Sequence, residues 1–306
     1  MNNIFDKLKK NLYDKDITLI LPESKDSRIV EATKRLKCLG FNILNIDDYK
    51  NNDLYISYLL SRKFTNNWPK DEIVKYLDDP LNKGLTMVAC GEADGLVAGA
   101  ITSTSDVLRS SLRIIGIENS AKWLSSFFLM ISNENQNQNQ NIFSFADCAV
   151  IPEPNVEQLV SIAENTSKMH ELITKELPKV AFLSFSTKGS ANHYRVEKVQ
   201  KAYELFTKRN PNICCDGEIQ FDAAISPSIS RKKIKNSNIN GNANVFIFPN
   251  LDAGNISYKI TRELGKYSAC GPLLIGLNKP VHDLSRSCSV EDIVNVATIA
   301  AIQKSS

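Results

Sequence analysis

Short apolar runs and amphipathic stretches alternate from near the start of the chain. Residues 17–21 form an apolar run that Pro22 ends, which is typical of a buried strand. Residues 24–39 then place their apolar side chains on one helical face, with Ser24 as the expected cap. Residues 41–46 form the next apolar run. This β–α–β order predicts an α/β fold with a mainly parallel sheet covered by helices.

The same alternation continues through the rest of the chain. The pattern predicts further strands at residues 86–90, 96–100, 123–131, 142–150, 180–185, 244–248 and 273–275. It predicts helices after a cap at Asn155 and at residues 104–115, 194–206, 255–266 and 293–302. The polar tract at residues 133–141 has no apolar side chain to bury, so we expect a disordered hairpin loop there.

Composition narrows the class of protein. The chain has 306 residues, of which 42% are hydrophobic and 23% charged, as in globular proteins with two domains or one large domain. The formal net charge of +3 is too small to indicate nucleic-acid binding. Seven cysteines without a C-x-x-C pair indicate reduced thiols and a cytoplasmic protein. No apolar run approaches the ~20 residues that a membrane span needs, so we expect no membrane segment.

Several common motifs are missing from the chain. It has no G-x-x-x-x-G-K-[ST], no G-x-G-x-x-G, no G-x-S-x-G and no H-E-x-x-H. Its three histidines, His170, His193 and His282, are not at ligand spacings, so we expect no metal site. These observations argue against nucleotide hydrolases, dinucleotide enzymes, serine hydrolases and zinc enzymes.

One polar segment leaves an expected strand and enters a helix, where α/β folds bind their ligands. This segment comprises Ser186, Thr187, Lys188, Gly189 and Ser190. Its hydroxyls, backbone N–H groups and helix start suit an anion. An ordinary turn between a strand and a helix has the same composition, so both interpretations stay open.

A second polar segment leads into the last expected helix. Ser285, Arg286 and Asp292 bring a hydroxyl, a guanidinium and a carboxylate close together, and arginine is well suited to binding phosphate through two parallel N–H groups. The alternative is structural, because Ser289 is a natural N-cap and Asp292 completes something close to a capping box. Arg109, near the start of another expected helix, is either a ligand to an anion or a solvated side chain.

Six blocks of the sequence together resemble the phosphate acetyltransferase family, within the wider group of phosphate acetyl- and butyryltransferases. The resemblance runs over nearly the whole chain, and the blocks follow the order of the family. They are LPESKDSRIVEA (21–32), ADGLVAGAITSTSDVLRSSLRIIG (93–116), FADCAVIPEPNVEQLVSIA (145–163), LSFSTKGSA (183–191), VFIFPNLDAGNISYKI (245–260) and GPLLIGLNKPVHDLSRSCSVEDIV (271–294).

The resemblance implies a fold shared with the isocitrate and isopropylmalate dehydrogenases, with two α/β domains and a cleft between them. The first domain would comprise residues 1–152 and 277–306, and the second residues 153–276. Members of the family are commonly homodimers and need no bound organic cofactor or tightly bound metal. The implied reaction converts acetyl-CoA and phosphate reversibly into acetyl phosphate and CoA, by direct transfer.

Position in the matched blocks also implies roles for individual residues. Ser285, Arg286, Asp292 and Arg109 correspond to catalytic residues of the family. In this interpretation the two arginines hold phosphate, the serine hydroxyl donates to the acetyl carbonyl oxygen, and the aspartate takes the proton of the CoA thiol.

The resemblance also implies residues that bind substrate, although the matching motifs support these assignments less strongly. Arg28 lies in a matched block, and Arg62 lies in a more weakly matching stretch. We expect both arginines and the Ser186–Ser190 segment to contact substrate. The chain departs from the family where His282 replaces the usual asparagine and Ser287 the usual glycine. A glycine there could supply a positive φ that serine adopts reluctantly, so the shape of that loop is the open question.

Three other functions compete with acetyl transfer. A phosphate butyryltransferase or other short-chain acyltransferase would use the same residues around a roomier acyl pocket. A dehydrogenase of the shared fold would need a nicotinamide site and metal-binding carboxylates. An inactive CoA-binding regulatory module is the non-enzyme alternative, and the joint presence of the four catalytic matches argues against it.

Overall fold

The computed structural model describes residues 4–12, 15–50, 53–119, 121–132 and 141–305. The chain divides into two compact units, residues 1–120 with 271–306 and residues 121–270. These limits differ from the sequence-based domain boundaries after residues 152 and 276. The reason lies in two strands, because β5 (Ile142–Ala146) pairs in parallel with β8 (Val245–Ile247) and therefore brings its hairpin partner into the sheet of the second unit.

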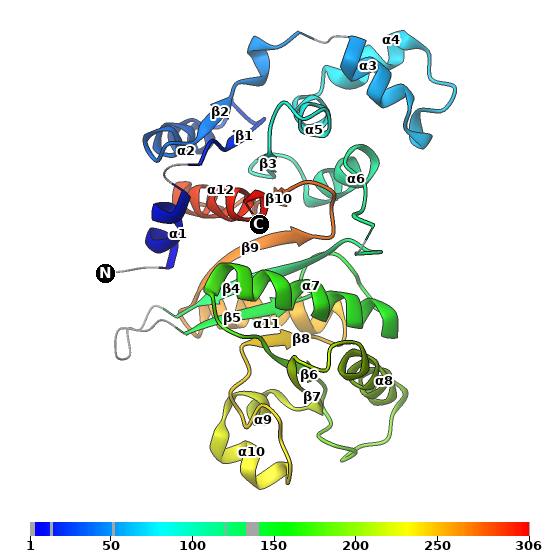
Figure 1. Cartoon of the computed structure of the whole chain (residues 1–306), viewed down its shortest axis with the longest axis vertical. Coiled ribbons are helices and arrows are strands. Elements are labelled where there is room, and N and C mark those ends of the chain that lie inside the picture. The colour runs from blue at the N-terminus through cyan, green and yellow to red at the C-terminus, as the bar shows by residue number, and fades with distance from the viewer. Residues whose placement is uncertain (1–3, 13–14, 51–52, 120, 133–140, 306) are drawn as a thin grey trace. The chain divides into compact units, whose positions relative to one another are not determined.

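The first unit contains a four-stranded parallel sheet in the order β10-β3-β1-β2 (Figure 1). Its elements are α1 (Ile4–Leu12), β1 (Thr18–Ile20), α2 (Ser27–Cys38), β2 (Asn42–Leu44), η1 (Ile46–Asp48), α3 (Asp53–Leu60), η2 (Lys63–Thr65), α4 (Lys70–Leu77), α5 (Pro80–Ala89), β3 (Gly95–Ala98), α6 (Thr104–Ile114), β10 (Val281–Asp283) and α12 (Val290–Lys304). The strand order reverses between β1 and β3, and in open parallel sheets ligands bind beside the carboxyl ends of the strands at such a point.

The last helix belongs to the core of the first unit. Every residue of α12 from Ile293 to Ile302 is buried, and the helix packs against α1, α2 and β3. Its start is fixed locally, because Ser289 and Asp292 form the expected capping box. The loop between β10 and α12 is therefore held at both ends by buried elements.

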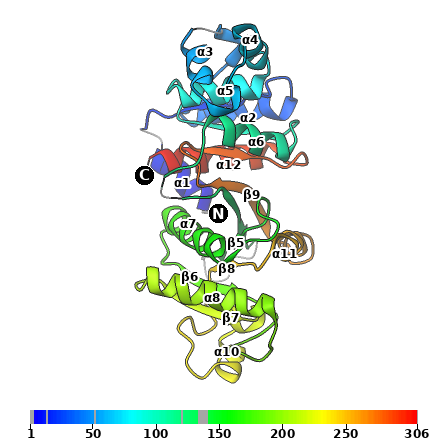
Figure 2. The same ribbon diagram turned by 90° about the vertical axis from the view of Figure 1, so that its right-hand side faces the viewer.

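The second unit is built on a sheet in the order β7-β6-β8-β5-β4-β9. Its elements are β4 (Ser125–Ile131), β5, α7 (Val156–Thr174), β6 (Lys179–Leu183), α8 (Tyr194–Arg209), β7 (Cys214–Ile219), α9 (Phe221–Ile225), α10 (Pro227–Lys233), β8, α11 (Leu251–Glu263) and β9 (Ser268–Ile275), which crosses the boundary between the units. The β5–β8, β6–β8 and β6–β7 pairs are parallel, and β4 and β5 form an antiparallel hairpin. Figure 2 shows α7 and α11 on opposite sides of β5.

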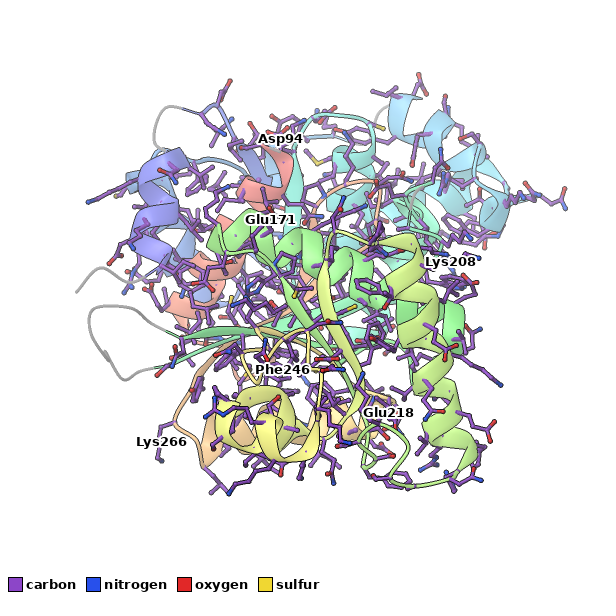
Figure 3. All side chains as sticks on the ribbon, turned by 60° about the horizontal axis from the view of Figure 1, so that its bottom comes forward. Asp94, Glu171, Lys208, Glu218, Phe246 and Lys266 are labelled. Atoms are coloured by element: carbon purple, nitrogen blue, oxygen red, sulfur yellow. The ribbon has the colours of Figure 1, made fainter. Side chains whose placement is uncertain are left out.

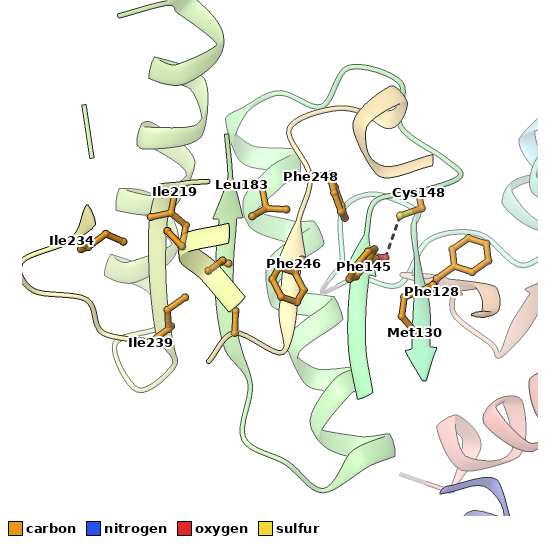
Figure 4. Close-up of a cluster of buried hydrophobic side chains, with 14 residues drawn as sticks. Phe128, Met130, Phe145, Cys148, Leu183, Ile219, Ile234, Ile239, Phe246 and Phe248 are labelled. Carbon is orange, nitrogen blue, oxygen red and sulfur yellow. Dashed lines mark hydrogen bonds between the residues drawn. The ribbon is translucent and has the colours of Figure 1, made fainter. Parts of the chain in front are cut away.

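Aromatic and aliphatic side chains fill the core between this sheet and its helices. Phe145, Phe246 and Phe248 pack with Leu183 and Ile219 from neighbouring strands and loops, all of them buried (Figure 4). The thiol of Cys148 donates to the carbonyl oxygen of Phe145 at 3.4 Å, the contact dashed in Figure 4. All seven cysteines of the chain are free thiols in the structure.

Most predicted strands and helices are confirmed, including the antiparallel hairpin around residues 133–141. The expectation for the tract itself lies outside the described residues, apart from Asn141. The cap at Asn155 is confirmed, whereas α2 is capped by Asp26 and not by Ser24. Helices α1, α3, α4, α9 and α10, the 3-10 helices η1 and η2, and strands β7 and β10 were not predicted.

One predicted strand is wrong, because residues 86–90 belong to α5 and the turn after it. The helix begins upstream, where the side chain of Asp79 accepts the N–H of Asn82 and Pro80 occupies the first turn. The helix buries nearly all sides of its second half, so its apolar run has no helical period.

At Gly254, helix propensity and packing predict opposite changes in stability for a substitution by alanine. A Cβ at this position of α11 would lie 2.2 Å from the carbonyl oxygen of Asp147. Alanine is favoured over glycine by about 1 kcal/mol in a helix, but overpacking costs about 1–3 kcal/mol. We expect Gly254→Ala to lower the melting temperature, whereas Ile256→Ala on the exposed side of α11 changes it little. A higher melting temperature for Gly254→Ala would contradict the close packing.

Candidate active site

Three loops of the first unit meet at the carboxyl edge of its parallel sheet. They are the β1–α2 loop (residues 21–26), the β3–α6 loop (residues 99–103) and the β10–α12 loop (residues 284–289). The last loop contains Ser285 and Arg286, and the second leads into the helix that contains Arg109. The fold thus brings together two of the segments that the sequence selects.

Glu23 holds the β3–α6 loop. Its buried carboxylate accepts four consecutive backbone N–H groups, those of Gly99 and Ala100 at 3.1 and 2.8 Å and those of Ile101 and Thr102 at 2.9 and 2.7 Å. Hydrogen bonds to a charged acceptor are about twice as strong as neutral ones. Sequence reasoning missed Glu23, although the residue follows a strand and Pro22 directly and stands within a matched block.

Arg28, the first predicted substrate ligand, is bonded to the protein itself. Its guanidinium donates to the carboxylate of Asp26 and to the backbone carbonyls of Ala100, Arg286 and Cys288. Arg28 therefore links the β1–α2 loop to both of the other loops.

The β10–α12 loop exposes the predicted catalytic pair. Ser285, Arg286 and Ser287 are exposed, and the hydroxyls of Ser285 and Ser287 lie 2.9 Å apart. The carbonyl of Ser285 accepts the N–H of Cys288 at 2.8 Å, which closes a turn. Ser287 is not among the described residues with positive φ, so its backbone does not need the glycine that the family usually has there.

Asp292 caps the start of α12 together with Ser289, which is the structural alternative to a catalytic role given in the sequence analysis. Its Oδ2 accepts the backbone N–H and the hydroxyl of Ser289, each at 2.8 Å. The carboxylate is partly exposed and lies in the first turn of α12, where a negative charge suits the helix dipole. The capping role of Asp292 is confirmed, and its catalytic role stays a prediction.

Arg109 lies on α6, one and a half turns after the N-cap Ser103. Its guanidinium pairs with Asp106 at 2.8 Å, and both side chains are more than half exposed, at 55% and 52%. An exposed pair of this kind contributes little free energy, about 0–1 kcal/mol. A substrate anion could therefore take the place of Asp106 at small cost.

Arg62 lines a pocket of about 440 Å³ with Lys63, Phe64 and Arg113. Its Nε donates to the carbonyl oxygen of Arg113 at 3.0 Å, which leaves the two Nη groups for other partners. Among the described residues, none of these three basic side chains forms an ion pair. The pocket therefore has the charge that an anionic group of a substrate requires.

The Ser186–Ser190 segment lies in the second unit, and a carboxylate of the chain already occupies it. Glu218, labelled in Figure 3, accepts the hydroxyl of Ser186 and the N–H of Gly189, each at 2.8 Å. The ammonium of Lys188 donates to the carbonyl of Gly217 at 2.9 Å and lies 3.1 Å from the buried Asp216. The donors expected to bind an external anion are thus largely satisfied within the chain.

Two buried titratable groups stand directly before Ser285. Burial lowers the pKa of His282 to about 3, and its Nδ1 accepts the N–H of Leu274 at 3.1 Å, so this ring is neutral. Asp283 accepts the hydroxyl of Thr104 at 2.6 Å through Oδ2, while its buried Oδ1 has no partner. Burial, with a smaller contribution from the charge of Glu23, raises the pKa of Asp283 to about 7.

Gly99 makes room for this aspartate. The glycine has a φ of +110°, and a Cβ there would lie 2.3 Å from Oδ1 of Asp283. Sequence reasoning missed Asp283, although the residue stands within a matched block. The described residues contain no cluster of three or more His, Cys, Asp or Glu side chains that could hold a metal ion.

Asp283 predicts a pH dependence of stability. Its pKa is raised in the folded state, so its proton stabilises the fold at low pH, and this contribution is lost as the pH rises from about 4 to about 7. An asparagine side chain cannot ionise, so we expect Asp283→Asn to gain stability relative to the unmodified chain between pH 5 and pH 8. Melting temperatures of both proteins at these two pH values test this. A constant difference would show that Asp283 does not titrate in this range.

Comparisons with known proteins agree with these observations. The family model described as "Phosphate acetyl/butaryl transferase" matches residues 6–301. The phosphate acetyltransferase of Acetivibrio thermocellus is 40% identical over 310 residues, which cover 94% of this chain and 93% of that protein. The phosphate acetyltransferase of Bacillus subtilis is 39% identical over 333 residues, covering 99% of both.

A solved structure gives the same result for the fold. The crystal structure of a phosphotransacetylase from Streptococcus pyogenes superposes with a TM-score of 0.90 and 36% identity, covering 98% of each chain. With this coverage the match extends over both compact units. The chain belongs to the phosphate acetyl/butyryl transferase family.

Proposed function

We propose that this chain catalyses the reversible transfer of an acetyl group between CoA and inorganic phosphate, forming acetyl phosphate and CoA from acetyl-CoA and phosphate. The observation that carries the proposal is its 40% identity, over nearly the whole chain, to a protein named phosphate acetyltransferase. Several relatives share that name, which favours acetyl over longer acyl groups as the substrate.

Phosphate must be held and oriented before it can attack a thioester. Arg286 is exposed on the β10–α12 loop, and Arg109 has only an exposed carboxylate as its ion-pair partner. Two guanidinium groups can bind the phosphate dianion by charge-assisted hydrogen bonds and orient one oxygen toward the acetyl carbon. We assign this task to Arg109 and Arg286.

The attack produces a tetrahedral intermediate with a negative oxygen. The hydroxyl of Ser285 is exposed, and its neighbour at 2.9 Å is the hydroxyl of Ser287, which can accept or donate. Ser285 is therefore able to turn its O–H toward the developing oxyanion while Ser287 donates to Ser285. In this role Ser287 supports the catalytic serine, a contact that glycine at this position cannot make.

In the reverse direction the CoA thiol must lose a proton before it attacks acetyl phosphate. A thiol with a pKa of about 8.5 is only a few per cent ionised at neutral pH, so a base is needed. We assign this role to Asp292, whose Oδ2 is engaged by Ser289 and whose side chain is partly exposed. In the forward direction the same carboxyl group returns the proton to CoA.

The remaining parts of the proposal concern binding and assembly. Arg62 and its basic pocket suit an anionic group of CoA, and the Ser186–Ser190 segment would need Glu218 to yield before its N–H groups could bind one. We expect no bound organic cofactor or metal, a homodimer, and a cytoplasmic location. Among the described residues, no helix combines the length and the apolar character needed to cross a membrane.

The activity itself is the first test. Purified protein should release free thiol from acetyl-CoA only when phosphate or arsenate is present, because these anions are the proposed acceptors of the acetyl group. A thiol-reactive dye measures the release, and acetyl phosphate is measured in parallel. Release at the same rate without either anion would identify a thioesterase and contradict the proposal.

Asp292 separates catalysis from helix capping. Asp292→Asn keeps an oxygen that can accept from Ser289, so we expect a nearly unchanged melting temperature. If the carboxylate is the base, kcat should fall by about 10²–10⁴-fold while KM values change little. The neighbouring Glu291→Gln is the matched control, because the ion-pair partners of Glu291 within the described part of the chain are Lys9 and Arg35. Turnover of Asp292→Asn close to that of the control would leave the carboxylate with the capping role alone.

A further inference from the structure

We infer that Arg28 is a positioning residue, which holds the β10–α12 loop in its active shape and makes no contact with substrate. The inference deepens the proposed function, since the loop contains Ser285 and Arg286. It also replaces the sequence-based expectation that Arg28 binds substrate. The inference rests on the hydrogen bonds of the Arg28 guanidinium, in which every N–H donor has an acceptor within the protein.

A guanidinium has five N–H donors: one on Nε and two on each Nη. In Arg28, Nε donates to Oδ1 of Asp26 at 3.0 Å, and Nη2 donates to Oδ2 of Asp26 at 2.7 Å and to the carbonyl of Ala100 at 2.9 Å. Nη1 donates to the carbonyls of Arg286 at 2.8 Å and Cys288 at 3.0 Å. Nη1 also lies 3.7 Å from Sγ of Cys288. The five oxygen acceptors alone match the five donors, so no donor is left for a phosphate or carbonyl of a substrate.

Asp26 fixes the position of Arg28 through contacts that do not involve the β10–α12 loop. Asp26 is the N-cap of α2 and also accepts the backbone N–H of Arg28 at 2.8 Å, so helix cap and ion pair share one carboxylate. The side-chain hydrogen bond to Arg28 is the main reason that the pKa of Asp26 is lowered. Both side chains are largely covered, at 29% and 13% exposed, which limits exchange with solvent.

The two carbonyls bound by Nη1 flank Ser287 and belong to the turn that Ser285 begins: Arg286 lies within the turn and Cys288 ends it. One cation therefore clamps the backbone next to both proposed catalytic side chains of the loop. A displacement of about 1 Å in a reacting group can lower a rate by about 10²-fold. Loss of the clamp should thus appear as a loss of turnover rather than as weaker binding of one substrate group.

The kinetic test compares Arg28→Lys and Arg28→Gln with the control Arg35→Gln. Arg35 lies on the same helix, and among the residues that the structure describes its ion-pair partners are Glu31 and Glu291. Rates are measured with CoA, with 3′-dephospho-CoA and over a range of phosphate concentrations. We expect kcat to fall by about 10²-fold in Arg28→Gln and by less in Arg28→Lys. The ratio of kcat/KM for CoA to kcat/KM for 3′-dephospho-CoA should be the same in the Arg28 variants as in the unmodified enzyme. Arg35→Gln should have the kinetic constants of the unmodified enzyme.

A second measurement reports on the loop without using activity. Arg286 is an exposed site for trypsin within the loop. Cleavage after Arg286, followed by the appearance of the fragment 287–306 in mass spectrometry, should be faster in both Arg28 variants than in Arg35→Gln. This result is expected even if the chain were to fail the acetyl-transfer assay, so the failure of the proposed function and the failure of this inference are distinguishable.

Two outcomes would overturn the inference. A raised KM for CoA with an unchanged KM for 3′-dephospho-CoA and an unchanged kcat would show that Arg28 binds the 3′-phosphate directly. Unchanged trypsin cleavage after Arg286 in folded variants would show that Arg28 does not hold the loop. If Arg28→Gln does not fold, Arg28→Lys, which keeps the charge beside Asp26 but has only three donors, undergoes both measurements.

Discussion

Two side chains of opposite charge on the β1–α2 loop and the start of α2 organise the carboxyl edge of the first unit. Glu23 accepts four backbone N–H groups of the β3–α6 loop, and Arg28 donates to three backbone carbonyls of that loop and the β10–α12 loop. Backbone N–H and C=O groups in loops lack the regular hydrogen bonds of helices and sheets. Here a carboxylate accepts the N–H groups and a guanidinium binds the carbonyls, and both kinds of hydrogen bond are strong because one partner is charged. Exposed groups such as Ser285 and Arg286 can then be held in place by a loop without being buried themselves.

At two other places in the chain, groups that are predicted to act on substrate already form hydrogen bonds within the protein. Asp292 caps α12, and the Ser186–Ser190 segment uses its donors on Glu218. The two cases differ in cost. Asn in place of Asp292 would still cap the helix, whereas removing Glu218 would take this acceptor from the buried hydroxyl of Ser186, at about 1–3 kcal/mol. A partly exposed cap is thus free to take part in proton transfer, while the buried carboxylate is committed to the fold.

The features that could be predicted from the sequence depend on residues that lie close together along the chain. The caps Asn155 and Ser289 and most strands follow from residues a few positions apart. The roles of Arg28 and Asp283 depend on partners 258 and 179 residues away, which no local pattern contains. The resemblance to a family drew attention to Arg28 but did not indicate which atoms it contacts. At α5 the error had a different cause, since an all-round buried helix carries an apolar run like that of a strand.

The place of α12 has a consequence for the order of folding during synthesis. Strands β4 to β8 and their helices come from consecutive residues, so these five strands can pair as soon as that stretch has emerged from the ribosome, and β9 follows directly. The first unit must wait, because β10 pairs with β3 and α12 covers β3 only after the whole of residues 121–270 has been made. Until then the nascent chain exposes the apolar face of β3, and a chaperone that recognises such surfaces would bind there first.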